Sequence, residues 1–141
     1  GALALFLHLQ IDGIEQNAAL VHKAGGCVVI HSDDENLSQR LNQEAAAAIA
    51  AGRKIGIDIK EADAIKWITA NPAKMLGIAD KTGTLEPGKM ADVVIWSADP
   101  FSVYALTDKV FIDGALIYDR KDKRFQPKSD FLLGHEGGDS Q

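Results

Sequence analysis

The feature that most constrains the fold is a short apolar run at residues 27–31, which reads Cys-Val-Val-Ile-His. It is rich in β-branched residues and lacks the alternation of apolar and polar positions that marks a strand with one face in water. Continuous apolar character is typical of a parallel strand that is buried on both faces. The run therefore predicts a parallel α/β fold around it.

The rest of residues 1–80 agrees with this prediction, because short apolar runs alternate with amphipathic stretches. A second strand is expected within residues 3–9. Asn71 is expected to cap a short helix that has Pro72 in its first turn and ends at Gly77. Longer helices are expected over residues 15–24, residues 37–51, where Gly52 would end the helix, and residues 61–70.

The pattern changes after residue 80 to short strands and turns. Pro87-Gly88 suits a type II turn. Asp113-Gly114 is a strong signal for a hairpin, and it would join two of the three strands expected at residues 91–96, 109–112 and 116–118. We therefore divide the chain into an α/β part over residues 1–80, a β part over residues 81–125 and a polar tail over residues 126–141.

Composition excludes several classes of function. The chain has 15 Lys and Arg against 20 Asp and Glu, a formal net charge of −5, so it lacks the basic surface expected of a nucleic-acid partner. No apolar run approaches the ~20 residues needed to cross a bilayer, so no membrane partner is expected. The single cysteine, Cys27, excludes an internal disulfide and a multi-cysteine zinc site, and its apolar neighbours predict a buried thiol.

Four motifs occur in an order that resembles the amidohydrolase superfamily of metal-dependent hydrolases. The most specific is Gly-Thr-Leu-Glu-Pro-Gly-Lys-Met-Ala-Asp-Val-Val at residues 83–94. Residues 69–78 resemble the helix that precedes it, residues 31–34 the end of the eighth barrel strand, and residues 110–114 a later hairpin. The nearest subgroup is that of the imidazolonepropionase-like amidohydrolases. The resemblance implies the last part of a (β/α)₈ TIM-type barrel followed by part of a small β-sandwich.

The same resemblance implies hydrolysis of the C–N bond of a small amide or cyclic amide. Asp33 matches the aspartate of the eighth strand, which in this family binds a divalent metal and accepts a proton from the attacking water. A bound cation lowers the pKa of its water toward ~7, so a nearby carboxylate can take the proton. Asp33 also lies where barrel enzymes keep catalytic residues, just after a strand. Asp33 is thus the expected catalytic residue and the expected metal ligand.

The other ligands of the family are absent from this sequence, which has no His-x-His pair. A catalytic zinc takes about three protein ligands, and a barrel about 250 residues. We expect zinc in a longer parent protein, little or none in this chain, and no activity of the chain alone. The expected partner is the missing N-terminal part, or a second copy through exposed strands. Residues 1–7 lack an initiator Met, which predicts a truncated chain and leaves the compartment open, with the cytoplasm favoured.

Simpler interpretations stay open beside these. Asp33 could merely cap the helix expected at residue 37, although Asp34 or Asn36 could do the same. Asp34 and Glu35 read as a solvated loop, and His31 as a histidine that is either structural or near the site. The glycines of residues 83–88 lack a P-loop pattern, and Lys89 and Asp92 read as structural. Trp67 and Trp96 read as packing residues, and His22 as a solvated helix position.

The alternative functions are a non-catalytic α/β module for binding or assembly, and, within the superfamily, a deaminase or a dipeptidase. Fold alone does not decide between them. Metal content separates the first alternative from a hydrolase. The substrate loops that would separate the others lie outside this sequence.

Overall fold

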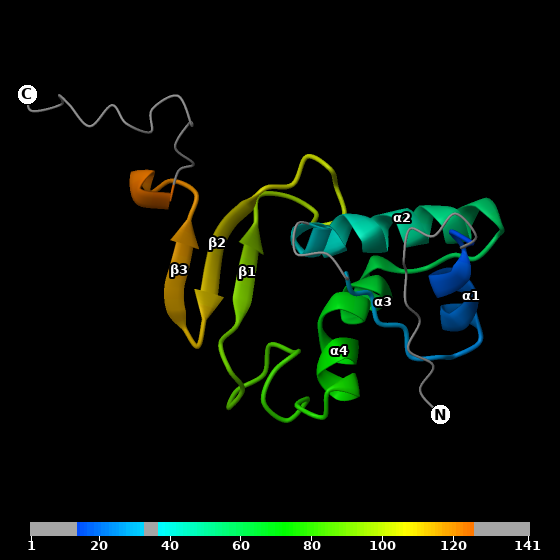
Figure 1. Ribbon diagram of the computed structural model, residues 1–141, viewed down its shortest axis with the longest axis horizontal. Coiled ribbons are helices and arrows are strands. Elements are labelled where there is room, and N and C mark those ends of the chain that lie inside the picture. The colour runs from blue at the N-terminus through cyan, green and yellow to red at the C-terminus, as the bar shows by residue number, and fades with distance from the viewer. Residues whose placement is uncertain (1–13, 33–36, 126–141) are drawn as a thin grey trace, which may run out of the picture.

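The computed structural model describes residues 14–32 and 37–125 of the chain, and in this part a group of helices lies beside a three-stranded sheet (Figure 1). The helical group comes first in the sequence and the sheet second. The helical elements are α1 (Asn17–Lys23), η1 (Leu37–Arg40), α2 (Leu41–Lys54), α3 (Glu61–Ala64), η2 (Ile65–Ile68) and α4 (Ala70–Met75).

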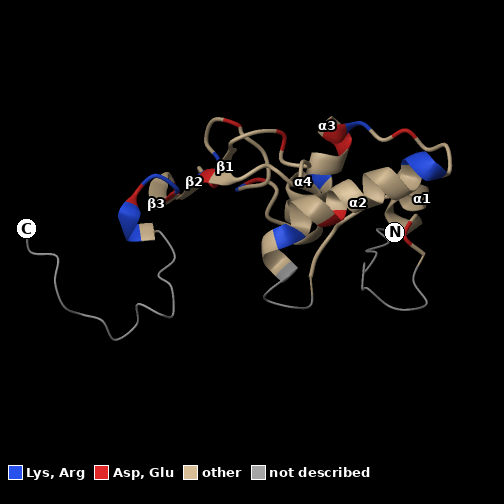
Figure 2. Ribbon diagram, turned by 90° about the horizontal axis from the view of Figure 1, so that it is seen from above, with Lys and Arg blue, Asp and Glu red and all other residues tan. Residues whose placement is uncertain are grey.

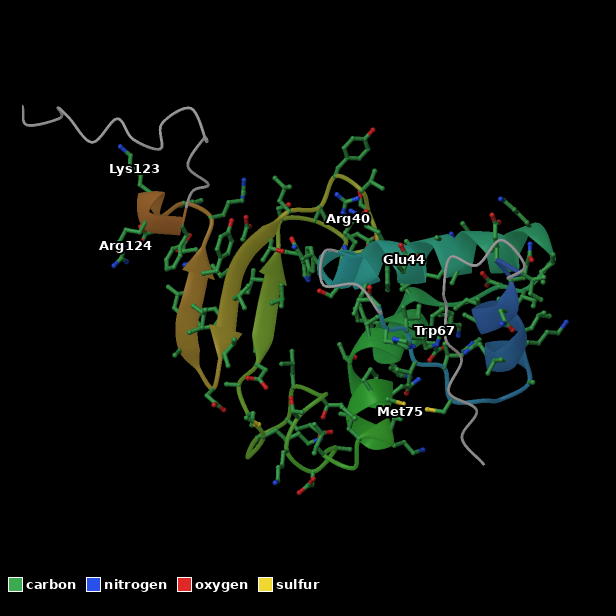
Figure 3. The ribbon with its side chains drawn as sticks, in the orientation of Figure 1. Arg40, Glu44, Trp67, Met75, Lys123 and Arg124 are labelled. Atoms are coloured by element: carbon green, nitrogen blue, oxygen red, sulfur yellow. The ribbon has the colours of Figure 1, made fainter. Side chains whose placement is uncertain are left out.

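The core lies among the helices and is built largely from alanine and branched aliphatic residues around one tryptophan. Trp67 is 1% exposed and is the largest of the buried side chains (Figure 3). Alanine side chains let α1 and α2 approach closely, because nothing beyond a methyl group separates the backbones. The buried cluster consists of Ala18, Ala19, Val28, Ile30, Ala45, Ala48, Ile49, Ile57, Ile59, Ala64 and Trp67.

Gly52 does not end a helix, contrary to the sequence prediction. It lies inside α2, which continues to Lys54, and the left-handed residue comes later at Gly56, whose φ is 76°. A Cβ at Gly52 would lie 2.8 Å from the Cβ of Ala19 and 2.9 Å from Cδ1 of Ile59. Glycine is required here because α1 and the chain after α2 pack directly against the helix backbone.

The run at residues 27–31, called the apolar segment below, is buried at its three central positions but does not form a strand. Val28, Val29 and Ile30 are each less than 5% exposed. Within the described residues this segment pairs with no other strand, and a parallel strand exists only beside a neighbour. The strand predicted over residues 3–9, its nearest neighbour in sequence, lies outside the described residues.

The sheet follows the sequence prediction closely. Strands β1 (Val93–Trp96), β2 (Thr107–Ile112) and β3 (Ala115–Asp119) form one antiparallel sheet in the order β1-β2-β3, followed by η3 (Lys123–Phe125). Asp113 and Gly114 have φ angles of 50° and 78°, as a type I′ hairpin turn requires. The described residues thus contain an antiparallel sheet beside α-helices, while the closed barrel and the complete sandwich stay predictions.

Acidic and basic residues occur on the helices and on the sheet alike, so both signs are spread over the described part (Figure 2). Among the described helices, none combines the length and the apolar character that a membrane span demands.

Candidate functional site

Asp33, the predicted catalytic residue, lies outside the described residues together with Asp34 and Glu35. The structure follows the chain to Ser32, so it describes the segment that leads to Asp33 and the contacts that hold this segment. His31, at the end of the apolar segment, is half-buried.

Two hydrogen bonds hold the apolar segment to the chain between residues 65 and 75. The side-chain Nδ2 of Asn71 donates to the carbonyl oxygen of Val28 at 2.7 Å. The backbone N–H of Ile30 donates to the carbonyl oxygen of Trp67 at 3.1 Å. A carbonyl oxygen can only accept, so the amide group of Asn71 has to face Val28 with its nitrogen. The segment is thus fixed on both sides of Val29.

Asn71 is not the N-cap of its helix, contrary to the sequence prediction. The N-cap of α4 is Thr69, and Asn71 is the second residue of the helix. Its side chain is used in the contact with Val28, which lies 43 residues earlier in the chain. Pro72 does lie in the first turn, as predicted, and Gly77 follows the helix with a φ of 73°.

Trp67, whose carbonyl binds the apolar segment, also contacts α1 through its ring. The ring of His22 meets the Trp67 ring edge-on, with 5.5 Å between centroids and 63° between planes. His22 is half-buried rather than a solvated position, so the sequence prediction for it was wrong. The cause is tertiary: the helix turns this side chain toward an aromatic residue from a distant part of the chain. Trp67 itself is a core residue, as predicted.

Asp63, an acidic residue of α3 near Trp67, forms an ion pair at the surface with Lys66. Nζ of Lys66 lies 2.8 Å from Oδ1 of Asp63. This hydrogen bond and the positive charge of Lys66 hold the pKa of Asp63 below its ordinary value, and His22 adds a smaller effect in the same direction. Asp63 is thereby kept ionised, but it stands on an exposed helix flank and has no other feature of a catalytic acid.

The motif at residues 83–94, called the turn motif below, makes structural contacts, as predicted for Lys89 and Asp92. The carboxylate of Asp92 accepts from Oγ1 of Thr82 at 3.2 Å and from the backbone N–H of Asp113 at 3.0 Å. Nζ of Lys89 lies 2.8 Å from Oε2 of Glu86 and donates to Oγ1 of Thr84. These side chains fold the turn and attach it to the hairpin.

The described residues do not by themselves form a metal site. Over residues 14–32 and 37–125, no three or more His, Cys, Asp and Glu side chains come together in a way that could hold a metal ion. Cys27 is half-buried rather than buried, because it stands at the start of the apolar segment, before the fully buried positions. A catalytic metal would therefore need ligands from beyond the described residues.

Sequence analysis missed Asn71 and Trp67 as supports of the candidate site. Both act through backbone groups of a segment about 40 residues away, and no local pattern records such a contact. One available signal was Thr69, a residue type that is itself favoured as an N-cap and precedes Asn71 by two positions. Thr69 does occupy the N-cap position, although its hydroxyl donates to the carbonyl oxygen of Ile65 and does not cap the helix.

The chain is similar to proteins described as imidazolonepropionase and as amidohydrolase. It is 30% identical over 129 residues to an imidazolonepropionase of Thermoplasma volcanium, a match that covers 85% of this chain and 31% of the relative. Its structure is similar to that of an amidohydrolase from Thermotoga maritima, with a TM-score of 0.65, 34% identity, and coverage of 75% of this chain and 26% of the other. The chain thus spans about a third of the length of such relatives.

A more distant similarity concerns the fold alone. A zinc-bound adenosine deaminase from Xanthomonas campestris superimposes with a TM-score of 0.60 at 22% identity, over 82% of this chain and 30% of that one. The profile described as the amidohydrolase family matches residues 11–117, which include the apolar segment, α4, the turn motif and the hairpin. The chain therefore belongs to the amidohydrolase family.

Proposed function

We propose that this chain is the part of a metal-dependent amidohydrolase that carries the eighth strand of a (β/α)₈ barrel, followed by part of a β-sandwich. The observation that carries the proposal is the family match over residues 11–117, a range that includes the apolar segment and Asp33. The burial of Val28, Val29 and Ile30 supports it, since a barrel strand is covered by the packed interior on one face and by helices on the other.

In this proposal Asp33 is the residue that takes the proton from the water that attacks the substrate. It follows the apolar segment by two residues, where a barrel places its catalytic groups. A divalent metal, with zinc the first candidate, would supply an acidified water when bound. The described residues offer no complete ligand set, so in this proposal the remaining ligands come from beyond the described residues.

The substrate class that the relatives favour is a small molecule with an amide or cyclic amide C–N bond. The support is the 30% identity to an imidazolonepropionase over most of this chain and the 34% identity to an amidohydrolase structure. The similarity to an adenosine deaminase is below 25% identity and carries the fold only. We therefore rank hydrolysis of a cyclic amide above deamination.

The test uses the longer protein that contains this chain. We expect it to hold one or two metal ions by elemental analysis and to open cyclic amides. Asp33→Asn should lower kcat by about 10²-fold or more, the typical contribution of a general base. Asp34→Asn is the matched control, because it removes the same charge one residue away, and it should retain most of the activity.

Three outcomes would count against the proposal. A longer protein without the other metal ligands, or one in which Asp33→Asn is as active as Asp34→Asn, would leave the non-catalytic α/β module as the better explanation. Release of ammonia from aminopurines, without opening of any cyclic amide, would assign the protein to the deaminases instead.

The proposal also includes a partner for the sheet, either the rest of the same protein or a second copy of the chain. Both outer strands, β1 and β3, have one edge that pairs with no other strand in the described part. Several of their apolar side chains are more than 40% exposed, namely Val94, Ile95, Leu116 and Ile117. An apolar sheet of this kind is stabilised by a covering layer.

A further inference from the structure

We propose that Asn71 is a positioning residue for the candidate active site: its side-chain amide fixes the course of the apolar segment as the chain approaches Asp33. This inference rests on the proposed function, because the segment matters for catalysis only if Asp33 does. The proposed role is positioning, because the side-chain amide of Asn71 contacts the backbone of Val28.

The geometry of the two contacts explains why they control direction. The carbonyl of Val28 belongs to the peptide plane before Val29, and the N–H of Ile30 belongs to the plane after it. Asn71 holds the first plane at 2.7 Å and the carbonyl of Trp67 holds the second at 3.1 Å. Peptide units are planar, so restraining an atom in each of two successive planes restricts both soft dihedral angles of Val29. The direction in which residues 30–32 leave is set accordingly.

The partners that hold the segment are themselves well anchored. Trp67 is 1% exposed and packs in the core, and α4, which carries Asn71, lies against the backbone of Gly83. Figure 3 shows Trp67 surrounded by the helices, below α2. Because η2 and α4 follow one another directly in the chain, one continuous support provides both contacts. A shift in either hydrogen bond would therefore also move the backbone at the end of the apolar segment.

The chemistry of the contact requires an amide at position 71. A carbonyl oxygen accepts only, so its partner has to donate. Aspartate has nearly the shape of asparagine, but when ionised it offers oxygen atoms alone and would repel the carbonyl of Val28. Asn71→Asp therefore removes the contact with little change in volume, and Asn71→Gln keeps a donor on a longer side chain.

Asn42 provides a matched control. Its Nδ2 donates to the carbonyl oxygen of Pro100 at 2.6 Å, so it is also an asparagine amide bound to a distant backbone carbonyl. It is 7% exposed and joins α2 to the loop after β1, away from the apolar segment. Asn42→Asp should destabilise the protein through the same chemistry, without disturbing the approach to Asp33.

The experiment combines hydrogen exchange with steady-state kinetics on the longer protein. In Asn71→Asp we expect amide exchange over residues 28–32 to accelerate about tenfold or more, whereas Asn42→Asp should accelerate exchange near residues 99–102 instead. We expect kcat of Asn71→Asp to fall about tenfold with an unchanged KM for the cyclic amide, partial recovery in Asn71→Gln, and wild-type values in Asn42→Asp.

The outcomes separate this inference from the proposed function. Unchanged exchange over residues 28–32, or kinetics equal to those of Asn42→Asp, would overturn the positioning role even if Asp33→Asn is inactive. If Asp33→Asn retains full activity, the proposed function fails and the catalytic meaning of Asn71 fails with it, whatever the exchange rates are.

Discussion

Asp92 binds the tip of the β2–β3 hairpin, because its Oδ1 accepts the backbone N–H of Asp113 at 3.0 Å. The neighbouring residues reinforce this link, since the N–H of Gly114 donates to the carbonyl of Ala91 at 3.1 Å. Oδ2 of Asp92 accepts from Oγ1 of Thr82, so one carboxylate connects the residue just before the turn motif with the hairpin. The aspartate of the family motif therefore organises the sheet.

The first prediction concerns this carboxylate. Asp92→Ala should lower the free energy of unfolding by about 1–2 kcal/mol, because it leaves a charge-assisted backbone hydrogen bond unmade at a position with access to water. Asp92→Asn should cost less, because it keeps an acceptor oxygen. Urea denaturation followed by circular dichroism provides the measurement, with exposed Asp58 changed to Ala as the control. Equal midpoints for Asp92→Ala and Asp58→Ala would refute the prediction.

The sequence predicted those features that depend on neighbouring residues. The predictions of a hairpin at Asp113-Gly114 and of a helix end at Gly77 were correct. Both depend on a positive φ angle, which glycine adopts readily and which the local sequence therefore indicates. The helix boundaries were less accurate: the helix expected over residues 61–70 is α3 followed by η2.

The features that failed depend on parts of the chain that are far apart in sequence. Gly52 looked like a helix end because its contacts with Ala19 and Ile59 are not visible in the local sequence. His22 and Asn71 were misinterpreted for the same reason. Asp33 was identified from a family resemblance, and no periodicity or spacing would have selected it. The residues that support it became visible only with tertiary contacts.

The second prediction concerns the core tryptophan. Trp67→Ala should lower the free energy of unfolding by about 3–5 kcal/mol, the usual cost of removing a large aromatic side chain from a packed interior. Trp67→Phe should cost less, since it keeps an aromatic face for His22. Denaturation with urea checks this, and the fluorescence of half-buried Trp96 supplies an independent probe. A loss below 1 kcal/mol in Trp67→Ala would contradict the burial of this side chain.

The third prediction concerns association. At high concentration the isolated chain should form dimers or larger species, because apolar side chains are exposed on both outer strands of the sheet. Ile95→Lys in β1 and Ile117→Lys in β3 should shift the population toward monomer by placing a charge on these strands. Size-exclusion chromatography with light scattering measures the effect. A clean monomer of the unsubstituted chain would count against self-association and leave the remainder of the longer protein as the partner.

The fourth prediction concerns the stability of the fold at acidic pH. A hydrogen bond from Lys89, then one from Thr84, then the charge of Lys89 hold the pKa of Glu86 below its ordinary value of 4.5. A lowered folded-state pKa contributes stability that is fully present above 4.5 and is lost as the pH falls from 4.5 through the folded value. Urea midpoints measured from neutral pH to below 4.5 should therefore fall less steeply in Glu86→Gln than in the wild type. The same slope in both proteins, with Glu61→Gln as the charge control, would show that this ion pair does not contribute.

The last prediction compares two glycines of the turn motif that share a backbone conformation but differ in surroundings. Gly83 and Gly88 have φ angles of 93° and 88°, a region that L side chains rarely adopt. A Cβ at Gly83 would lie 2.6 Å from the Cβ of Ala73 in α4, whereas a Cβ at Gly88 would meet nothing within 4 Å. Gly88→Ala should therefore cost only the backbone strain, roughly 1–2 kcal/mol.

Gly83→Ala adds overpacking to that strain and should cost roughly 2–5 kcal/mol in total. Removing the methyl group of Ala73 in the double variant Gly83→Ala, Ala73→Gly should recover part of the loss, because it relieves the shortest contact. A double-mutant cycle measured by urea denaturation gives the coupling directly. If Gly83→Ala and Gly88→Ala were equally stable, or the two changes at Gly83 and Ala73 were simply additive, the turn motif would not pack against α4 as described.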